Sequence, residues 1–121
     1  MKMGDPKELI VWQKAMDVVV HTYLLSEKFP AKETFGLTAQ MRRAAISIPS
    51  NIAEGRRRST EKEFKYFLNV AFGSAAELET QIEIALRLHF FEEAPSQKLS
   101  VLLQEVMRML NKMISVIKNH S

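Results

Sequence analysis

The stretch TEKEFKYFLNVAFGSAAELETQIEIA, residues 60–85, decides the fold of this 121-residue chain. Its apolar residues recur in alternating steps of four and three, which indicates a helix with one buried seam over three heptads. The stretch begins with Thr60 and Glu63 at the spacing of a capping box, a usual helix start. The seam consists of Phe64, Leu68, Ala71, Ala75, Leu78, Ile82 and Ala85. We therefore predict a long amphipathic helix over residues 60–89.

The chain before this stretch predicts two more helices. Asp5 and Pro6 suit the cap and first turn of a helix over residues 8–28, and Pro30 and Gly36 mark the loop that follows it. The core stripe predicted for this first helix is Leu9, Trp12, Met16, Val19, Val20, Tyr23 and Leu24. A second helix is predicted over residues 37–55, where Gly55 suits its end. Its core stripe is Leu37, Met41, Ala44, Ala45, Ile48 and Ile52.

The chain after the stretch predicts a last helix over residues 95–118. Its core stripe is Leu99, Leu102, Val106, Met109, Met113 and Val116. No strand-like alternation of apolar and polar residues competes with these helical patterns. Four helices joined by short loops predict an all-α fold, an up-down-up-down antiparallel four-helix bundle that forms a single domain over residues 1–121.

Pro49 falls in the middle of the second predicted helix. Proline removes a backbone donor and crowds the preceding turn, so we expect a kink near this position. The hydroxyls of Ser47 and Ser50 could bond the carbonyls that the proline releases. Alternatively, the helix stops near Ile48 and starts again with Ser50 as its cap.

Composition narrows the class of protein. Hydrophobic residues make up 46% of the chain, and the absence of cysteine excludes disulfides and thiolate chemistry. The sequence has no apolar leader behind a basic start and no apolar run of about 18 residues, so we expect a cytoplasmic protein without a membrane partner. The net charge is +3, and residues 1–60 carry ten Lys and Arg against six Asp and Glu. This uneven balance is compatible with a polyanionic partner.

Three of the predicted helices carry a second apolar face beyond the one that a single core requires. Ordered apolar faces of this kind mark partner surfaces, so we expect a homo-oligomer that buries them. Scattered surface hydrophobes are the alternative explanation. The residues assigned to this oligomer interface are Val11, Ala15, Val18, Leu25, Ala39, Ile46, Ala53, Tyr66 and Val70.

The search for catalytic or ligand-binding motifs is negative. The sequence contains no Glu-x-x-His pair, no glycine-rich phosphate loop and no nucleophile turn, so we predict no catalytic residue, no metal and no cofactor. A polar stripe on the second helix and one glutamate of the third are assigned to contacts between helices, with Glu77 as an ion-pair partner for an arginine across a helix or subunit contact. These residues are Arg43, Ser47, Ser50, Glu54 and Glu77.

A basic cluster between the second and third helices is the strongest positive signal. Five cations fall within ten residues, and arginine and lysine clusters can hold phosphates. An arginine-rich turn can equally be solvated or relieve the negative pole of a helix end. We expect no base-reading aromatic among these cations, so binding should be governed by backbone charge and shape more than by sequence. The predicted nucleic-acid contacts are Arg56, Arg57, Arg58, Lys62 and Lys65, with Arg42 as an outlying contributor.

The segments LIVWQKAMDVV (9–19), SIPSNIAEG (47–55) and ELETQ (77–81) resemble the four-helix-bundle proteins encoded in intervening sequences of bacterial 23S rRNA genes. The resemblance spans roughly residues 8–118. It implies a left-handed up-and-down bundle that assembles as a homopentamer, and the accessory variability protein of diversity-generating retroelements is a similar pentamer that binds nucleic acid. The family supplies no catalytic residues to transfer.

From the sequence we expect a non-enzymatic homo-oligomer that binds structured RNA or DNA through a repeated basic surface. One alternative is a scaffold whose partners are only proteins. A second alternative is an enzyme, which requires a deep pocket where Arg43, Ser47, Asn51 and Glu54 converge.

Overall fold

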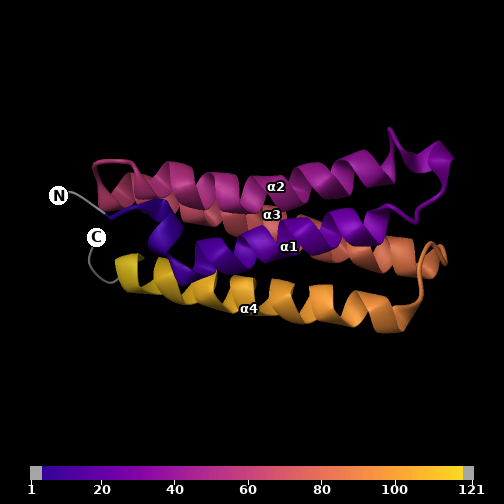
Figure 1. The fold of residues 1–121 in the computed structure, drawn as a ribbon. Coiled ribbons are helices and arrows are strands. Elements are labelled where there is room, and N and C mark those ends of the chain that lie inside the picture. Colours follow the sequence, from indigo (N-terminus) through magenta and orange to yellow (C-terminus); the bar gives the residue numbers. More distant parts are fainter. Residues whose placement is uncertain (1–3, 119–121) are drawn as a thin grey trace.

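The computed structural model describes residues 4–118 and consists of four long helices. They are α1 (Ile10–Ser26), α2 (Leu37–Arg56), α3 (Glu61–Arg87) and α4 (Glu93–Lys118), with short 3-10 turns η1 (Pro6–Glu8) and η2 (Ala31–Glu33). Consecutive helices run in opposite directions, and α1 contacts α4 to close the bundle (Figure 1). The predicted all-α four-helix bundle is confirmed. None of the helices between residues 4 and 118 has the length and apolar character needed to cross a membrane.

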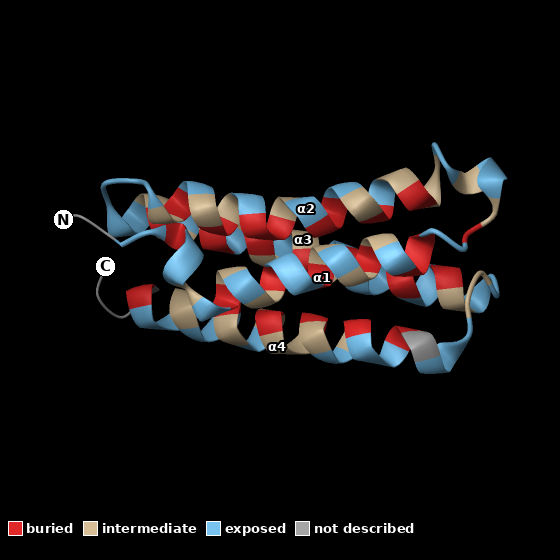
Figure 2. Ribbon diagram, viewed as in Figure 1, coloured by how far each residue is buried: buried red, intermediate tan, exposed pale blue. Residues whose placement is uncertain are grey.

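The core lies along the axis of the bundle, where each helix turns one stripe inward (Figure 2). All seven residues of the predicted α3 seam are buried. The predicted α2 stripe is buried as well, apart from the half-buried Leu37. These two helices follow the prediction because each has one clearly dominant apolar face.

The prediction for α1 is wrong, because its two apolar faces are exchanged. Val11, Ala15, Val18 and Leu25, which the sequence assigned to an oligomer interface, lie in the core of the protomer. The stripe predicted to be core lies outside: Met16, Val20 and Leu24 are exposed, and Leu9, Trp12, Val19 and Tyr23 are half-buried. The core side of α1 thus carries the smaller Ala15 and two valines, whereas the larger Trp12 and Met16 lie on the other side of the helix.

The core stripe of α4 also differs from the prediction. Leu99 and Val106 are buried as expected, but Leu103, Leu110 and Ile117 complete the stripe. Leu102, Met109 and Met113 are only half-buried, and Val116 is exposed. Leucines and methionines follow one another closely on this helix, so several stripes have similar apolar content and periodicity alone does not choose between them.

The helix α2 continues without interruption through Pro49, so the alternative of a break near Ile48 is wrong. Pro49 itself is buried. The Ser47 hydroxyl lies 2.8 Å from the Ser74 hydroxyl of α3, and the Asn51 amide donates to the Ser47 carbonyl at 2.8 Å. Ser47 therefore links two helices, and Asn51 supplies a donor to the backbone beside the proline. The kink itself stays a prediction.

A polar link joins each pair of neighbouring helices. Arg42 of α2 donates to Ser26 of α1, Ser47 of α2 meets Ser74 of α3, Gln104 of α4 donates to Glu79 of α3, and Lys14 of α1 pairs with Glu105 of α4 at 2.7 Å. The hydrogen bond and charge of Lys14 hold the pKa of Glu105 below its usual value. The pair stabilises the folded state at pH values above the usual pKa of a glutamate, and this stabilisation is lost as the pH falls through the lowered pKa of Glu105.

The ends of the helices shift by a few residues from the prediction. Asp5 accepts a hydrogen bond from the backbone of Lys7 at 3.0 Å, but the turn that it caps is η1, and α1 starts only at Ile10. Leu9 is extended and separates the two. The Thr60 hydroxyl accepts from the Glu63 backbone at 3.2 Å, so the predicted cap of α3 is present.

A Schellman motif ends α3 two residues before the predicted position. His89 adopts a left-handed conformation with φ of 62°, the backbone N–H of Phe90 donates to the Ala85 carbonyl at 3.0 Å, and that of His89 donates to Leu86 at 3.0 Å. This position favours glycine, because any side chain on an L-residue is strained there. Histidine therefore holds the turn at a conformational cost.

We expect the substitution His89→Gly to stabilise the protein by about 0.5–1 kcal/mol, which corresponds to a rise of a few degrees in Tm. Thermal unfolding followed by circular dichroism measures the change. Glycine in place of Asn111, at an exposed position within α4, should instead destabilise the protein. A lower Tm for His89→Gly would contradict the assignment of this turn.

Candidate nucleic-acid interface

The basic cluster lies at one end of the bundle, where α2 ends and α3 begins (Figure 1). Its position depends on Gly55, because a Cβ there would stand 2.7 Å from the Cβ of Phe67 and 3.3 Å from the Phe64 carbonyl. Only glycine lets the end of α2 approach the start of α3 this closely. We call residues 56–65 the basic turn; its cations are Arg56, Arg57, Arg58, Lys62 and Lys65.

Two of the five cations are engaged within the protomer. Arg58 pairs with Glu54 at 2.6 Å and lies 4.9 Å from the centre of the Phe67 ring. Arg56 is half-buried with its guanidinium 5.8 Å from the centre of the Phe64 ring, and its Nε is buried without a hydrogen-bond partner. These contacts hold the turn in shape and reduce the charge that it can offer to a phosphate.

Arg57, Lys62 and Lys65 are less constrained. The Arg57 side chain is 69% exposed and reaches Asp5 only at 3.9 Å, a loose ion pair that contributes little. Lys62 is exposed and Lys65 half-buried, and neither pairs with a carboxylate among residues 4–118. The three side chains are therefore the cations of the turn that are available to an external anion.

Aromatic residues accompany the basic turn, contrary to the expectation from the sequence. Phe64 and Phe67 lie beside arginines, and Tyr66 packs edge-on against Phe67 with its ring centre 5.1 Å away. The Tyr66 side chain is 63% exposed. An exposed ring beside cations is of the kind that can stack on an unpaired base.

Arg42 does not belong to this interface, which corrects the prediction. It lies fourteen residues before Arg56 on α2, about 21 Å along the helix axis. Its Nε donates to the Ser26 hydroxyl at 2.9 Å and its guanidinium lies 4.4 Å from the centre of the Tyr23 ring. Arg42 therefore closes the end of α1, where a cation is favourable.

The polar stripe of α2 does not converge on a pocket. Arg43 and Ser50 are exposed, Ser47 bonds Ser74, and Glu54 pairs with Arg58. Asn51 donates to Ser47, Glu54 pairs with Arg58 and Arg43 is exposed, so the four residues that the enzyme alternative requires do not converge. 

Glu77 accepts a hydrogen bond from Gln81 on its own helix at 3.2 Å. It forms no ion pair with an arginine within the part of the chain that the structure describes, so the predicted contact is wrong for the protomer. Gln81 is buried, and its Oε1 has no hydrogen-bond partner. No group of three or more metal-ligating side chains occurs among the described residues.

Two apolar grooves lie on the outside of the bundle. The first, of about 350 Å³, runs between α1 and α2 and ends near the basic turn; it is lined by Trp12, Met16, Val19, Ile46, Pro49, Ser50 and Ala53. The second, of about 370 Å³, lies between α3 and α4; it is lined by Phe64, Met109, Lys112, Met113, Val116 and Ile117. The sequence indicated an outer apolar face on α2 correctly but placed the residues of α1 on the wrong side.

Comparison with known proteins identifies the family. The family model described as "23S rRNA-intervening sequence protein" matches residues 7–112, which is most of the chain. The chain belongs to this family. Among curated proteins there is no match.

A solved structure shares the fold of this 23S rRNA-intervening sequence family member. It is the crystal structure of a protein with unknown function from the S23 ribosomal protein family of Bacteroides thetaiotaomicron, at a TM-score of 0.80 and 22% identity over 88% of this chain and 96% of that one. At this identity the likeness concerns the fold alone. Neither the family nor this neighbour indicates an enzyme activity.

Proposed function

We propose that this chain is a non-enzymatic homo-oligomer, a pentamer by family resemblance, that binds structured RNA or DNA through basic turns brought together by assembly. The observation that carries the proposal is that the exposed Arg57 and Lys62 and the half-buried Lys65 lie at the end of the bundle where an outer apolar groove ends. A copy that covers this groove contacts Ala53, one helical turn before the arginines. Assembly therefore brings several basic turns within reach of one polyanion, and linked sites bind far more tightly than one.

The proposed interface between copies uses the apolar residues that the protomer leaves outside. On α1 these are Trp12, Met16 and Val19, which replace the residues found in the core. The remaining members are Ala39, Ile46, Ala53, Tyr66 and Val70. An apolar groove on each side of the bundle supports self-association, since exposed apolar patches of this kind mark partner surfaces.

The test is a salt titration of affinity for a labelled RNA hairpin. The triple variant Arg57→Glu, Lys62→Glu and Lys65→Glu should bind at least about tenfold more weakly, and the slope of log affinity against log salt should fall by about 2–3, because each lost phosphate contact removes about 0.9. The matched control reverses Lys28, Lys32 and Lys98 at the other end of the bundle, with the same change in net charge. It should keep the slope of the parent.

Two outcomes would contradict the proposal. If the triple variant and its control bound the RNA with equal affinity, the basic turn would not be the nucleic-acid interface, and the protein scaffold would be favoured. If the protein sedimented with the mass of one chain at micromolar concentration, it would not be a homo-oligomer. Far-ultraviolet circular dichroism of each variant establishes that the helices are intact, since all six substituted positions lie on the surface or are half-buried.

A further inference from the structure

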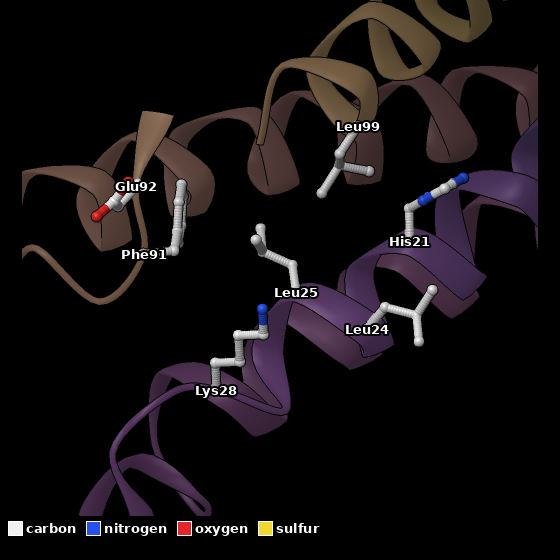
Figure 3. Close-up of a pocket in the computed structure, with 7 residues that line it drawn as sticks. All are labelled: His21, Leu24, Leu25, Lys28, Phe91, Glu92 and Leu99. Atoms are coloured by element: carbon white, nitrogen blue, oxygen red, sulfur yellow. The ribbon is translucent and has the colours of Figure 1, made fainter. Parts of the chain in front are cut away.

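A cavity of about 490 Å³ lies at the end of the bundle opposite the basic turn, between the end of α1 and the start of α4 (Figure 3). This volume falls within the range of about 300–1,000 Å³ that is usual for small-molecule sites. Its lining combines an apolar surface with a few polar groups; the residues are His21, Leu24, Leu25, Lys28, Phe91, Glu92 and Leu99. The proposed nucleic-acid interface uses none of them.

The apolar wall of this cavity is held in place by the core. Leu25 and Leu99 are buried and belong to the main hydrophobic cluster. The Phe91 ring stacks on the buried Phe29 with ring centres 5.8 Å apart and planes 10° from parallel, and Phe29 also contacts Phe90 at 5.4 Å. The wall is thus formed before any ligand binds, which lowers the cost of ordering on binding.

Lys28 gives the cavity its charge. Figure 3 shows the Lys28 side chain turned toward the space between Leu25 and Phe91, whereas the carboxylate of Glu92 is directed away from it. Lys28 forms no ion pair with any residue between positions 4 and 118. An ammonium beside an apolar wall and without an internal counter-charge is complementary to a single carboxylate that carries an apolar body.

The dimensions of the cavity set the length of the apolar part of such a ligand. His21 lies on α1, and Lys28 lies seven residues later in the turn that follows the end of α1 at Ser26, so the two are roughly 10 Å apart along the direction of the helix axis. Leu24 and Leu25 fall between the two, so the apolar surface extends along this length. A polyphosphate or a nucleotide fits poorly, because one lysine faces the cavity and Glu92 stands at its rim.

We propose that this cavity binds one molecule of an amphipathic monocarboxylic acid. The carboxylate pairs with the Lys28 ammonium, and the apolar chain lies along Leu25, Leu99 and Phe91 toward His21. Burial of the chain supplies most of the binding free energy, and the lysine fixes the orientation of the ligand.

The experiment titrates decanoate into the full-length, isotopically labelled protein and follows backbone amide shifts by NMR. We expect saturable binding with a Kd of about 1 mM or tighter, and shifts confined to the end of α1, the α3–α4 loop and the start of α4. Lys28→Met keeps the length of the side chain and removes its charge, so decanoate should bind about tenfold more weakly. Lys32→Met, on the exposed turn nearby, is the matched control and should bind as the parent does.

Decanol separates the charge from the apolar chain. It should bind the parent more weakly than decanoate does, and Lys28→Met should bind it as well as the parent. The proposal is overturned if decanoate fails to saturate the cavity at about 10 mM, if Lys28→Met and Lys32→Met bind it equally, or if the shifts lie along the α1–α2 groove. None of these outcomes depends on whether the basic turn binds nucleic acid.

Discussion

Replacing Val18 with aspartate should abolish the folded state of the protein. Val18 is fully buried in the core, where its side chain contributes about 1.5–3 kcal/mol by burial. An aspartate there adds an unpaired carboxylate in an apolar site, and the combined loss of about 5 kcal/mol or more is comparable to the whole stability of a small domain. Circular dichroism should show loss of helix, or the expressed protein should be insoluble.

Val20→Asp is the matched control, with the same residue types exchanged two positions further along α1. Val20 is 53% exposed, so its aspartate remains hydrated and the helix should keep its circular dichroism signal. The pair tests which face of α1 forms the core. If Val20→Asp unfolded the protomer while Val18→Asp remained folded, the orientation of α1 in the bundle would be wrong.

Gly55→Ala should lower the stability by about 2 kcal/mol and the Tm by about 5–10 °C. The added Cβ would lie 2.7 Å from the Cβ of Phe67 and 3.0 Å from a ring carbon of Phe64. The first of these atoms is fixed to the backbone of α3 and cannot swing away, so α2 and α3 must separate. This loss exceeds the gain of about 1 kcal/mol that alanine brings within a helix.

Gly73→Ala provides the comparison within the same pair of helices. Gly73 is exposed on α3 and no atom lies within 4 Å of an added Cβ, so only the gain in helix propensity remains. We expect a stabilisation of about 0.5–1 kcal/mol, measured by urea unfolding alongside Gly55→Ala. A Gly55→Ala protein as stable as Gly73→Ala would show that the contact between the two helix ends is looser than described.

The sequence was sufficient for the fold where one face of a helix dominates. The α3 seam and the α2 stripe follow the prediction, because on each helix one apolar face repeats at heptad spacing and dominates the others. On α1 both faces are apolar, so apolar content alone does not indicate which of them forms the core. The steps of four and three from Val11 through Ala15, Val18 and Thr22 to Leu25 repeat the spacing of the α3 seam, which was the signal available.

The candidate site was predictable in position but not in its internal pairing. The run of arginines after Gly55 places the basic turn, and the spacing of Glu54 and Arg58 already suits an ion pair on one helix face. Two features depend on contacts between segments that are distant in the sequence. Asp5 lies near Arg57, and Arg42 binds at the end of α1 instead of belonging to the basic turn. Neither local spacing nor composition contains that information.

The four polar links between neighbouring helices also bear on handedness. The same four helices could in principle be arranged in a left-turning or a right-turning order, with each helix beside the same two neighbours and the same apolar stripes inward. In the mirror arrangement the flanks of every helix are exchanged, so Lys14 would turn away from Glu105 and Ser47 away from Ser74. A variant in which alanine replaces the side chains of all four links should therefore keep its helix content but no longer favour one of the two arrangements over the other.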